Sequence, residues 1–183
     1  MRLSGGELRS REISVPPGRT IRPTPGRVKE ALFSIVGERL RDAAVLDLFA
    51  GTGAIGFEAL SRGAAHATFV EAHRPTALRL RLTAARLGVE ARTTVVAAPA
   101  ERAARALAGP FDFVYADPPY ADGPPAAALA ALRASGAIGP QTLVVYEHRP
   151  GAIDLGAAGF VSRRTVRYGD VALDFLSAER ADA

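Results

Sequence analysis

Apolar and polar residues alternate along this chain with two periods, and the changes of period predict a series of strands and helices. Short apolar runs that suit buried strands cover residues 45–50, 67–71, 92–96, 111–116 and 142–146. Apolar residues at helical spacing, or alanine-rich runs, predict helices at residues 27–41, 54–61, 75–87, 100–107 and 125–134. A closing antiparallel pair of strands is predicted at residues 160–167 and 171–176.

The order of these elements predicts an α/β fold. Strands that alternate with helices form a mostly parallel sheet, and helices then cover both of its faces. With the closing pair the sheet has seven strands, and a small basic hairpin or arm precedes it at residues 1–15. Sheets of this kind bind ligands beyond the carboxyl ends of their strands, so we expect the chemistry to lie in the loops there.

The composition fits one globular unit and excludes several kinds of site. The chain has 183 residues, of which 48% are hydrophobic and 23% charged, as in a single domain with a sizeable core. It has no cysteine, which excludes disulfides and cysteine nucleophiles, and its three histidines are too scattered to predict a metal site. No apolar run has the length of a membrane span or resembles a signal peptide, so we expect a cytoplasmic protein without membrane contact.

Positive charge is concentrated near the N-terminus. Residues 1–41 hold nine basic and four acidic side chains, whereas the rest of the chain has a net charge of −1. A basic arm on a nearly neutral body predicts a polyanionic partner. The alternative is a solvated surface in an arginine-rich protein, since Lys29 is the only lysine. We therefore divide the chain into a basic extension with the first helix, residues 1–41, and a main domain, residues 42–183.

A glycine-rich loop follows the first predicted strand. Residues 51–56 read Gly-Thr-Gly-Ala-Ile-Gly, a pattern whose glycines let the backbone turn sharply and approach a ligand closely. Glu71 lies 20 residues after Gly51, at the end of the second predicted strand. A carboxylate at that place can accept hydrogen bonds from both ribose hydroxyls of a nucleoside. The arrangement predicts a nucleoside cofactor, either NAD or S-adenosylmethionine (SAM).

Asp47 favours SAM. A dinucleotide-binding fold usually keeps its first, buried strand apolar, whereas here an acid lies four residues before Gly51. The run resembles the first motif of SAM-dependent methyltransferases, in which an acid at this place helps to hold the loop and the methionine end of the cofactor. Glu71 resembles their second motif. The alternative for Asp47 is a buried acid that holds the loop amides without touching a ligand.

Residues 117–120 read Asp-Pro-Pro-Tyr and follow the fourth predicted strand, at the same edge as the glycine loop. An exocyclic amino group of a base is a poor nucleophile, and two acceptors on its N–H groups can localise its lone pair. The Asp117 carboxylate and the Pro118 carbonyl supply such acceptors, while Pro118 and Pro119 stiffen the loop. Tyr120 offers a ring on which the base can stack. The motif predicts methyl transfer to an amino nitrogen; the alternative is a simple turn.

Over nearly its full length the chain resembles the bacterial 16S ribosomal RNA guanine-N2 methyltransferases, a family of small single-domain enzymes. The resemblance rests on residues 2–6, 18, 22–33, 46–56, 58–64, 117–120 and 168–169. It implies the Rossmann-like fold of SAM-dependent methyltransferases and methyl transfer from SAM to N2 of a specific guanine in 16S rRNA. It also implies that the substrate is the small ribosomal subunit or its assembly intermediate. We expect a monomer.

The resemblance and the motifs together give the candidate site residues. Those expected to hold the cofactor are Asp47, Ala50, Gly51, Thr52, Gly53, Glu71, Ala72 and Ala100. Those expected to act in catalysis are Asp117, Pro118, Pro119 and Tyr120. Those expected to contact RNA are Arg2, Arg9, Arg11, Arg22, Arg27 and Lys29, with the cofactor carboxylate as an alternative for the last two. The chain departs from the family at Pro25-Gly26, where a polar residue and Asp are usual, and near residues 98–100, where an acid is common.

Other functions account for fewer of these features. A DNA adenine-N6 methyltransferase needs an element that reads DNA sequence, and the chain has no obvious second domain to carry one. A protein-glutamine methyltransferase uses the same type of tetrapeptide but gains nothing from a basic arm. A non-catalytic, SAM-binding RNA chaperone has no need of Asp117 and the two prolines, and an NAD-dependent oxidoreductase leaves residues 117–120 unexplained.

Overall fold

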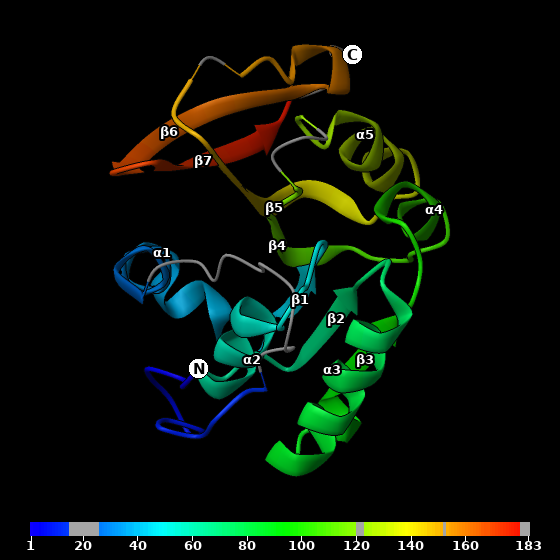
Figure 1. The fold of residues 1–183 in the computed structure, drawn as a ribbon. Coiled ribbons are helices and arrows are strands. Elements are labelled where there is room, and N and C mark those ends of the chain that lie inside the picture. Colours follow the sequence, from blue (N-terminus) through cyan, green and yellow to red (C-terminus); the bar gives the residue numbers. More distant parts are fainter. Residues whose placement is uncertain (15–25, 120–122, 152, 180–183) are drawn as a thin grey trace.

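In the computed structural model, which describes residues 1–14, 26–119, 123–151 and 153–179, the chain folds around one seven-stranded sheet (Figure 1). The strands lie in the order β3-β2-β1-β4-β5-β7-β6. The first five pair in parallel, and β7 runs antiparallel to both β5 and β6. The predicted α/β class, the mostly parallel sheet and the closing antiparallel pair are therefore confirmed.

The bounds of the elements follow the predicted order. The strands are β1 (Ala44–Asp47), β2 (His66–Val70), β3 (Thr93–Val96), β4 (Phe111–Ala116), β5 (Ile138–His148), β6 (Phe160–Tyr168) and β7 (Val171–Ala178). The α-helices are α1 (Gly26–Val36), α2 (Ala54–Ser61), α3 (Arg74–Leu87), α4 (Ala100–Ala104) and α5 (Ala126–Ala134). Short 3-10 turns are η1 (Gly37–Leu40), η2 (Glu90–Arg92) and η4 (Gly156–Ala158).

Several elements have bounds other than those that the sequence pattern predicts. The helix expected at 27–41 ends at Val36, because Gly37 has a φ of 54° and the chain continues as the tighter η1. The helix expected at 100–107 ends at Ala104. The strand expected at 142–146 is longer at its start, because Ile138 already pairs with Phe111 ahead of an irregularity in the register between β4 and β5.

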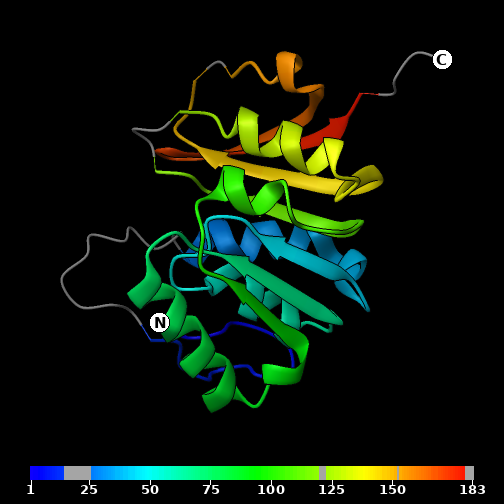
Figure 2. The same ribbon diagram turned by 90° about the vertical axis from the view of Figure 1, so that its right-hand side faces the viewer.

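Helices cover both faces of the sheet, as predicted (Figures 1 and 2). One apolar cluster joins α1, α2 and α3 to one face, and a second joins α4 and α5 to the other. Four phenylalanines of the first cluster are almost completely buried: Phe33, Phe57, Phe69 and Phe113. Truncation of such a side chain to alanine typically costs about 3–5 kcal/mol, so this face contributes much of the stability that holds the sheet edge in place.

The N-terminal segment packs into the first of these clusters. Residues Leu3 and Ile13 are each only 2% exposed, and Arg2 and Glu12 form an isolated antiparallel bridge that closes the segment into a hairpin. Val28 and Leu32 of α1 belong to the same cluster. The boundary predicted at residue 41 thus separates regions of different charge, whereas the apolar packing is continuous across it.

The described part of the chain contains no helix that is long and apolar enough to cross a membrane. Among the same residues, no group of acidic side chains and histidines is placed to hold a metal ion.

Candidate functional site

The sheet has a switch point between β1 and β4. From β1 the chain winds outward through β2 to β3, and it then returns to the other side of β1 to form β4 and β5. The loops that follow β1 and β4 therefore diverge at their carboxyl ends, which is where open parallel sheets bind ligands. The glycine loop follows β1 and Asp117 follows β4, so the two predicted motifs flank this point.

The glycine loop has the conformation that its sequence predicts. Gly51 and Gly53 have φ values of 51° and 76°, in the left-handed region that side chains disfavour. A Cβ atom on Gly53 would lie 2.6 Å from a methyl carbon of Leu80 and 2.7 Å from a ring carbon of Phe57. Gly53 is also the residue before α2, so the loop directs the N-terminal end of that helix towards the edge of the sheet.

Asp47, the last residue of β1, is buried and holds the start of α2. Its Oδ2 accepts a hydrogen bond of 3.1 Å from the backbone N–H of Gly56, which is the loop-holding contact that the sequence leaves as an alternative. Burial raises the pKa of Asp47 to about 7; the Gly56 N–H lowers it and the nearby Glu71 carboxylate raises it by smaller amounts. Near neutral pH, this carboxyl is therefore poised between its charged and neutral forms.

Glu71 follows β2 and is joined directly to the glycine loop. Its two carboxylate oxygens accept hydrogen bonds from the backbone N–H groups of Gly51, at 3.0 Å, and His73, at 2.7 Å. The carboxylate is half-buried, so a ligand at the edge can reach it. The structure thus brings the acid into contact with the first glycine of the loop.

The remaining cofactor candidates surround the same loop. Ala50 is buried and its N–H donates to the carbonyl of Val70, which ties the loop to the end of β2. Thr52 is buried, Ala72 is exposed beside Glu71, and Ala100 is the buried first residue of α4, after β3. Each therefore lies in, or directly after, a loop that follows β1, β2 or β3.

Asp117 follows β4 and is partly buried. Burial first, and then the negative charges of Glu147 and Asp47, raise the pKa of Asp117 to about 8. Pro118 is buried and Pro119 is exposed, while Tyr120 lies outside the described residues. Asp117 has the environment of a group that takes up and releases a proton near neutral pH, which is typical of functional carboxyls.

The sequence pattern misses one acid at this edge. Glu147 is the second-last residue of β5, is 3% exposed, and accepts a hydrogen bond from the hydroxyl of Tyr115. Ala116 pairs in register with Tyr146, so Asp117 and Glu147 each come one residue later on neighbouring strands. The sequence contains a signal for Glu147. It is a charged residue directly after an apolar run, at the carboxyl end of the strand that follows β4 in the chain.

Four carboxyls lie along the edge that is formed by the carboxyl ends of the parallel strands. Asp47, Glu71, Asp117 and Glu147 follow or end β1, β2, β4 and β5. None of the described cations forms an ion pair with Asp47, Glu71 or Asp117. Carboxylate oxygens accept hydrogen bonds and attract positive charge. These carboxyls therefore fit a ligand with a ribose diol and positive charge, as in the sulfonium and ammonium groups of SAM, and in their charged form they would repel the pyrophosphate of a dinucleotide.

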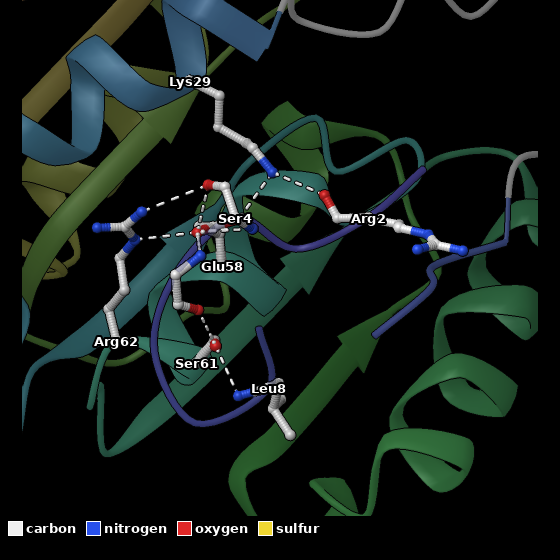
Figure 3. A network of polar contacts seen from close by, with 8 residues as sticks. Arg2, Ser4, Leu8, Lys29, Glu58, Ser61 and Arg62 are labelled. Carbon is white, nitrogen blue, oxygen red and sulfur yellow. Dashed lines mark hydrogen bonds and ion pairs between the residues drawn. The ribbon is translucent and has the colours of Figure 1, made fainter. Parts of the chain in front are cut away.

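A second group of charged residues, around Glu58 of α2, has a different organisation (Figure 3). The Lys29 ammonium lies 2.7 Å from Glu58, and the backbone N–H groups of Ser4 and Gly5 donate to the same carboxylate at 2.9 and 2.8 Å. Arg62 adds an ion pair at 3.0 Å. Burial raises the pKa of Glu58, but the Lys29 and Ser4 contacts outweigh it and hold the pKa below its ordinary value. We call these residues (Ser4, Gly5, Lys29, Glu58 and Arg62) the latch.

The latch includes Lys29, one of the residues predicted to contact RNA. Lys29 is only 5% exposed, and its ammonium group also donates to the carbonyl of Arg2. The RNA contact of Lys29 stays a prediction; in this structure its charge lies inside the protein and fixes the N-terminal segment to α2.

The other predicted RNA contacts remain on the surface. Arg9 and Arg27 are exposed, and Arg2 is exposed beside Glu12 at 3.1 Å. Arg11 is exposed and donates to the backbone carbonyl of Arg86 in α3 at 3.1 Å. Arg22 lies outside the described residues.

Comparisons with known proteins agree with this geometry. The chain is 35% identical over 147 residues to ribosomal RNA small subunit methyltransferase D of Escherichia coli K12, covering 80% of this chain and 74% of that protein. It is 35% identical over 123 residues to a Bacillus subtilis protein named as an rRNA methyltransferase, YlbH, covering 66% and 67% of the two chains. The solved structure of yhhF from Escherichia coli matches with a TM-score of 0.87 and 33% identity over 98% of both chains.

A more distant structure shares the fold alone. An RNA methyltransferase from Salinibacter ruber, solved with S-adenosyl-L-homocysteine, has a TM-score of 0.65 and 18% identity over 88% of this chain and 95% of that one. The family model described as conserved hypothetical protein 95 matches residues 1–177. The fold is that of SAM-dependent methyltransferases, and the chain belongs to the conserved hypothetical protein 95 family, together with the small-subunit rRNA methyltransferase D proteins.

Proposed function

We propose that this protein transfers a methyl group from SAM to the exocyclic N2 amino group of one guanine in 16S rRNA of the small ribosomal subunit. The observation that carries the proposal is the position of Asp117-Pro118-Pro119 directly after β4, beside the glycine loop and Glu71 at the switch point of the sheet. The Escherichia coli relative, which is named for the small subunit, supports an rRNA substrate. We place the reaction in the cytoplasm and expect a monomer to perform it.

The cofactor half of the site is formed by the loops after β1 and β2. The Glu71 carboxylate can accept hydrogen bonds from the ribose hydroxyls, because it is half-buried at the edge and is already oriented by the N–H groups of Gly51 and His73. Asp47 holds the start of α2 through the Gly56 N–H, and its charged form adds negative charge near a cationic ligand. When bound, SAM supplies a methyl carbon that is activated by its positive sulfur.

The chemical step depends on Asp117. Its carboxylate accepts one N–H of the guanine amino group and the Pro118 carbonyl accepts the other, which localises the nitrogen lone pair towards the methyl carbon. With SAM bound, the nitrogen–carbon bond would form as the sulfur–carbon bond breaks, with a neutral thioether as the leaving group. The methylated amine then gives up one proton to Asp117, whose pKa of about 8 suits a proton acceptor near neutral pH.

The substrate half of the site is basic. The exposed arginines of residues 1–41 can bind RNA phosphates while the target base turns into the site. The latch holds the segment that carries Arg2 and Arg9 against α2, the helix that begins at the glycine loop. The segment proposed to bind RNA and the loop proposed to bind the cofactor are therefore joined through α2.

The test is transfer of a labelled methyl group from SAM to undermethylated small ribosomal subunits, free 16S rRNA and DNA in parallel, followed by nucleoside analysis by mass spectrometry. We expect N2-methylguanosine from the subunit RNA. N6-methyladenine in DNA would keep the chemistry but refute the substrate, and SAM binding without transfer to any nucleic acid would refute both the reaction and the RNA substrate.

A further inference from the structure

The outer face of α3 carries two exposed apolar side chains. Leu78 is 54% and Leu82 is 61% exposed, and among the described residues these are the two large hydrophobic side chains that are exposed. They lie four residues apart and therefore share one side of the helix. Figures 1 and 2 show α3 on the outside of the molecule, at the β3 end of the sheet. Apolar residues gathered within a polar surface mark a binding surface more often than scattered single residues do.

Every charged residue of α3 is an arginine. Arg74, Arg79, Arg81 and Arg86 are all exposed, and the helix contains no acidic residue. Arg81 and Arg86 also donate to the backbone carbonyls of Val95 and Glu12, at 3.0 and 2.6 Å. Arg74 and Arg79 make no hydrogen bond or ion pair with the described residues, so their guanidinium groups are available to a ligand. A helix face with this composition suits an anionic occupant.

The face is continuous with the basic N-terminal segment. Arg11 donates to the carbonyl of Arg86, and Arg86 donates to the carbonyl of Glu12, so the end of α3 and the hairpin are held side by side. The other end of the helix begins at Arg74, three residues after Glu71 at the cofactor edge. With 14 residues, α3 is about 21 Å long. One basic surface thus leads from the hairpin along α3 to the loops of the site.

We propose that the outer face of α3, defined by Arg74, Leu78, Arg79, Leu82 and Arg86, binds the sugar-phosphate backbone of the rRNA that flanks the target guanine. The inference rests on the proposed function and names a second part of the RNA-binding surface. The arginines contact phosphates, and the leucines pack against the less polar faces of the riboses and bases between them. RNA is favoured over a protein partner because three of the five residues of the face are arginines, and the whole helix contains no acidic residue.

The experiment removes positive charge from α3 at exposed side chains that make no described contact. The double variant Arg74→Gln/Arg79→Gln changes two exposed side chains that have no described partner, and Arg102→Gln/Arg105→Gln is the matched control. The control residues are exposed arginines on and just after α4, which covers the opposite face of the sheet. Affinity for 16S rRNA and for small ribosomal subunits is measured at several salt concentrations. SAM affinity and thermal unfolding are measured for each protein.

We expect the α3 variant to bind rRNA roughly tenfold more weakly at about 150 mM salt, and its log–log salt slope to be smaller by about 1 to 2. SAM affinity and thermal unfolding should match those of the unchanged chain, and the control should bind rRNA normally. Equal rRNA binding by the α3 variant and the control would overturn the inference while leaving the proposed function intact.

Two further outcomes separate the alternatives. A loss of binding that occurs with small subunits but not with protein-free rRNA would assign the α3 face to a ribosomal protein and overturn the RNA assignment. If the unchanged chain bound and methylated no RNA, the proposed function would fail and the inference with it. The variant Leu78→Ala/Leu82→Ala should weaken rRNA binding a few-fold with an unchanged salt slope, because no phosphate contact is lost.

Discussion

Asp47 and Glu58 are two buried carboxyls with different surroundings. Asp47 accepts a hydrogen bond from the start of α2, and Glu58 belongs to α2. Glu58 is fully buried and is met by Lys29, by Arg62 and by the N–H groups of the N-terminal segment. Asp47 is 2% exposed and receives one backbone N–H, from Gly56. The contacts lower the pKa of Glu58, whereas burial raises the pKa of Asp47 to about 7.

The difference separates structure from function. A buried charge that is matched by cations and N–H groups within the protein contributes to holding the fold together. A buried carboxyl without a cation costs stability in its charged form, and such groups are concentrated where a ligand supplies the missing charge. By this criterion the latch around Glu58 is structural, while the edge with Asp47 and Asp117 is the candidate site.

The largest expected effect comes from Asp117, at the carboxyl ends of the parallel strands. The substitution Asp117→Asn keeps the size of the side chain but removes the negative charge and the proton acceptor. We expect kcat for methyl transfer to fall by about 10²–10⁴, since this is the usual contribution of a positioned acid or base. Affinity for SAM should change less than about threefold. Single-turnover assays at saturating SAM and small subunits, with calorimetry for SAM, measure both; near-normal turnover would remove Asp117 from the mechanism.

The second effect comes from the latch and appears in stability. Lys29→Met leaves the Glu58 charge buried with only part of its partners, and we expect the free energy of unfolding to fall by about 3–5 kcal/mol. The exposed pair Arg41–Glu38 is a matched control, and Glu38→Gln should cost less than about 0.5 kcal/mol. Urea unfolding measures both variants. A loss below about 1 kcal/mol for Lys29→Met would show that the latch does not hold the fold.

The latch should also make the free energy of unfolding depend on pH in the acid range. Since the folded-state pKa of Glu58 is lowered, its contribution is present above the unfolded-state pKa, 4.5, and is lost as pH falls through the lower folded-state value. Folded Lys29→Met protein should lack most of this acid-dependent loss of stability. An unchanged pH dependence below pH 5 would assign the loss to other groups.

A smaller effect is expected for Asp47→Asn on cofactor affinity. The asparagine can still accept the Gly56 N–H, so the loop keeps its shape, but the charge below a cationic ligand is removed. We expect SAM to bind about 10–100-fold more weakly, which corresponds to roughly 1.4–2.7 kcal/mol. Calorimetric titration with SAM tests this, and titration with adenosine serves as an uncharged control. Equal losses for the two ligands would contradict an electrostatic role.

The smallest expected effect follows from removing the charge of Glu147. Its negative charge is one of the causes that raise the pKa of Asp117. Replacement by Gln removes that charge, so Asp117 should ionise at lower pH and the acid limb of kcat/KM against pH should move to lower pH. The exposed substitution Glu101→Gln is the control. A limb that stays in place, or that moves to higher pH, would contradict this role for Glu147.

The sequence predicts much of the fold because buried parallel strands are short apolar runs and their order determines the sheet. Residues 51–53, Glu71 and Asp117 were found by motif and spacing, and the structure places them at one edge. The burial of Lys29 cannot be predicted from the sequence, because a count of charges does not report which of them are buried. Glu147 was missed because its relation to Asp117 depends on the pairing of β4 with β5, which are separated by more than 20 residues.

The measurement that tests the account most directly is the free energy of unfolding at pH 5.5 and 7.5, without cofactor, for the unchanged chain and Asp47→Asn. In this range a folded-state pKa of about 7 keeps a proton on Asp47 that the unfolded chain, with a pKa of 3.8, has lost. Stability therefore falls as pH rises, by about 1–2 kcal/mol more in the unchanged chain than in the variant. Parallel profiles would contradict the claim that the edge holds a buried carboxyl without a matching cation.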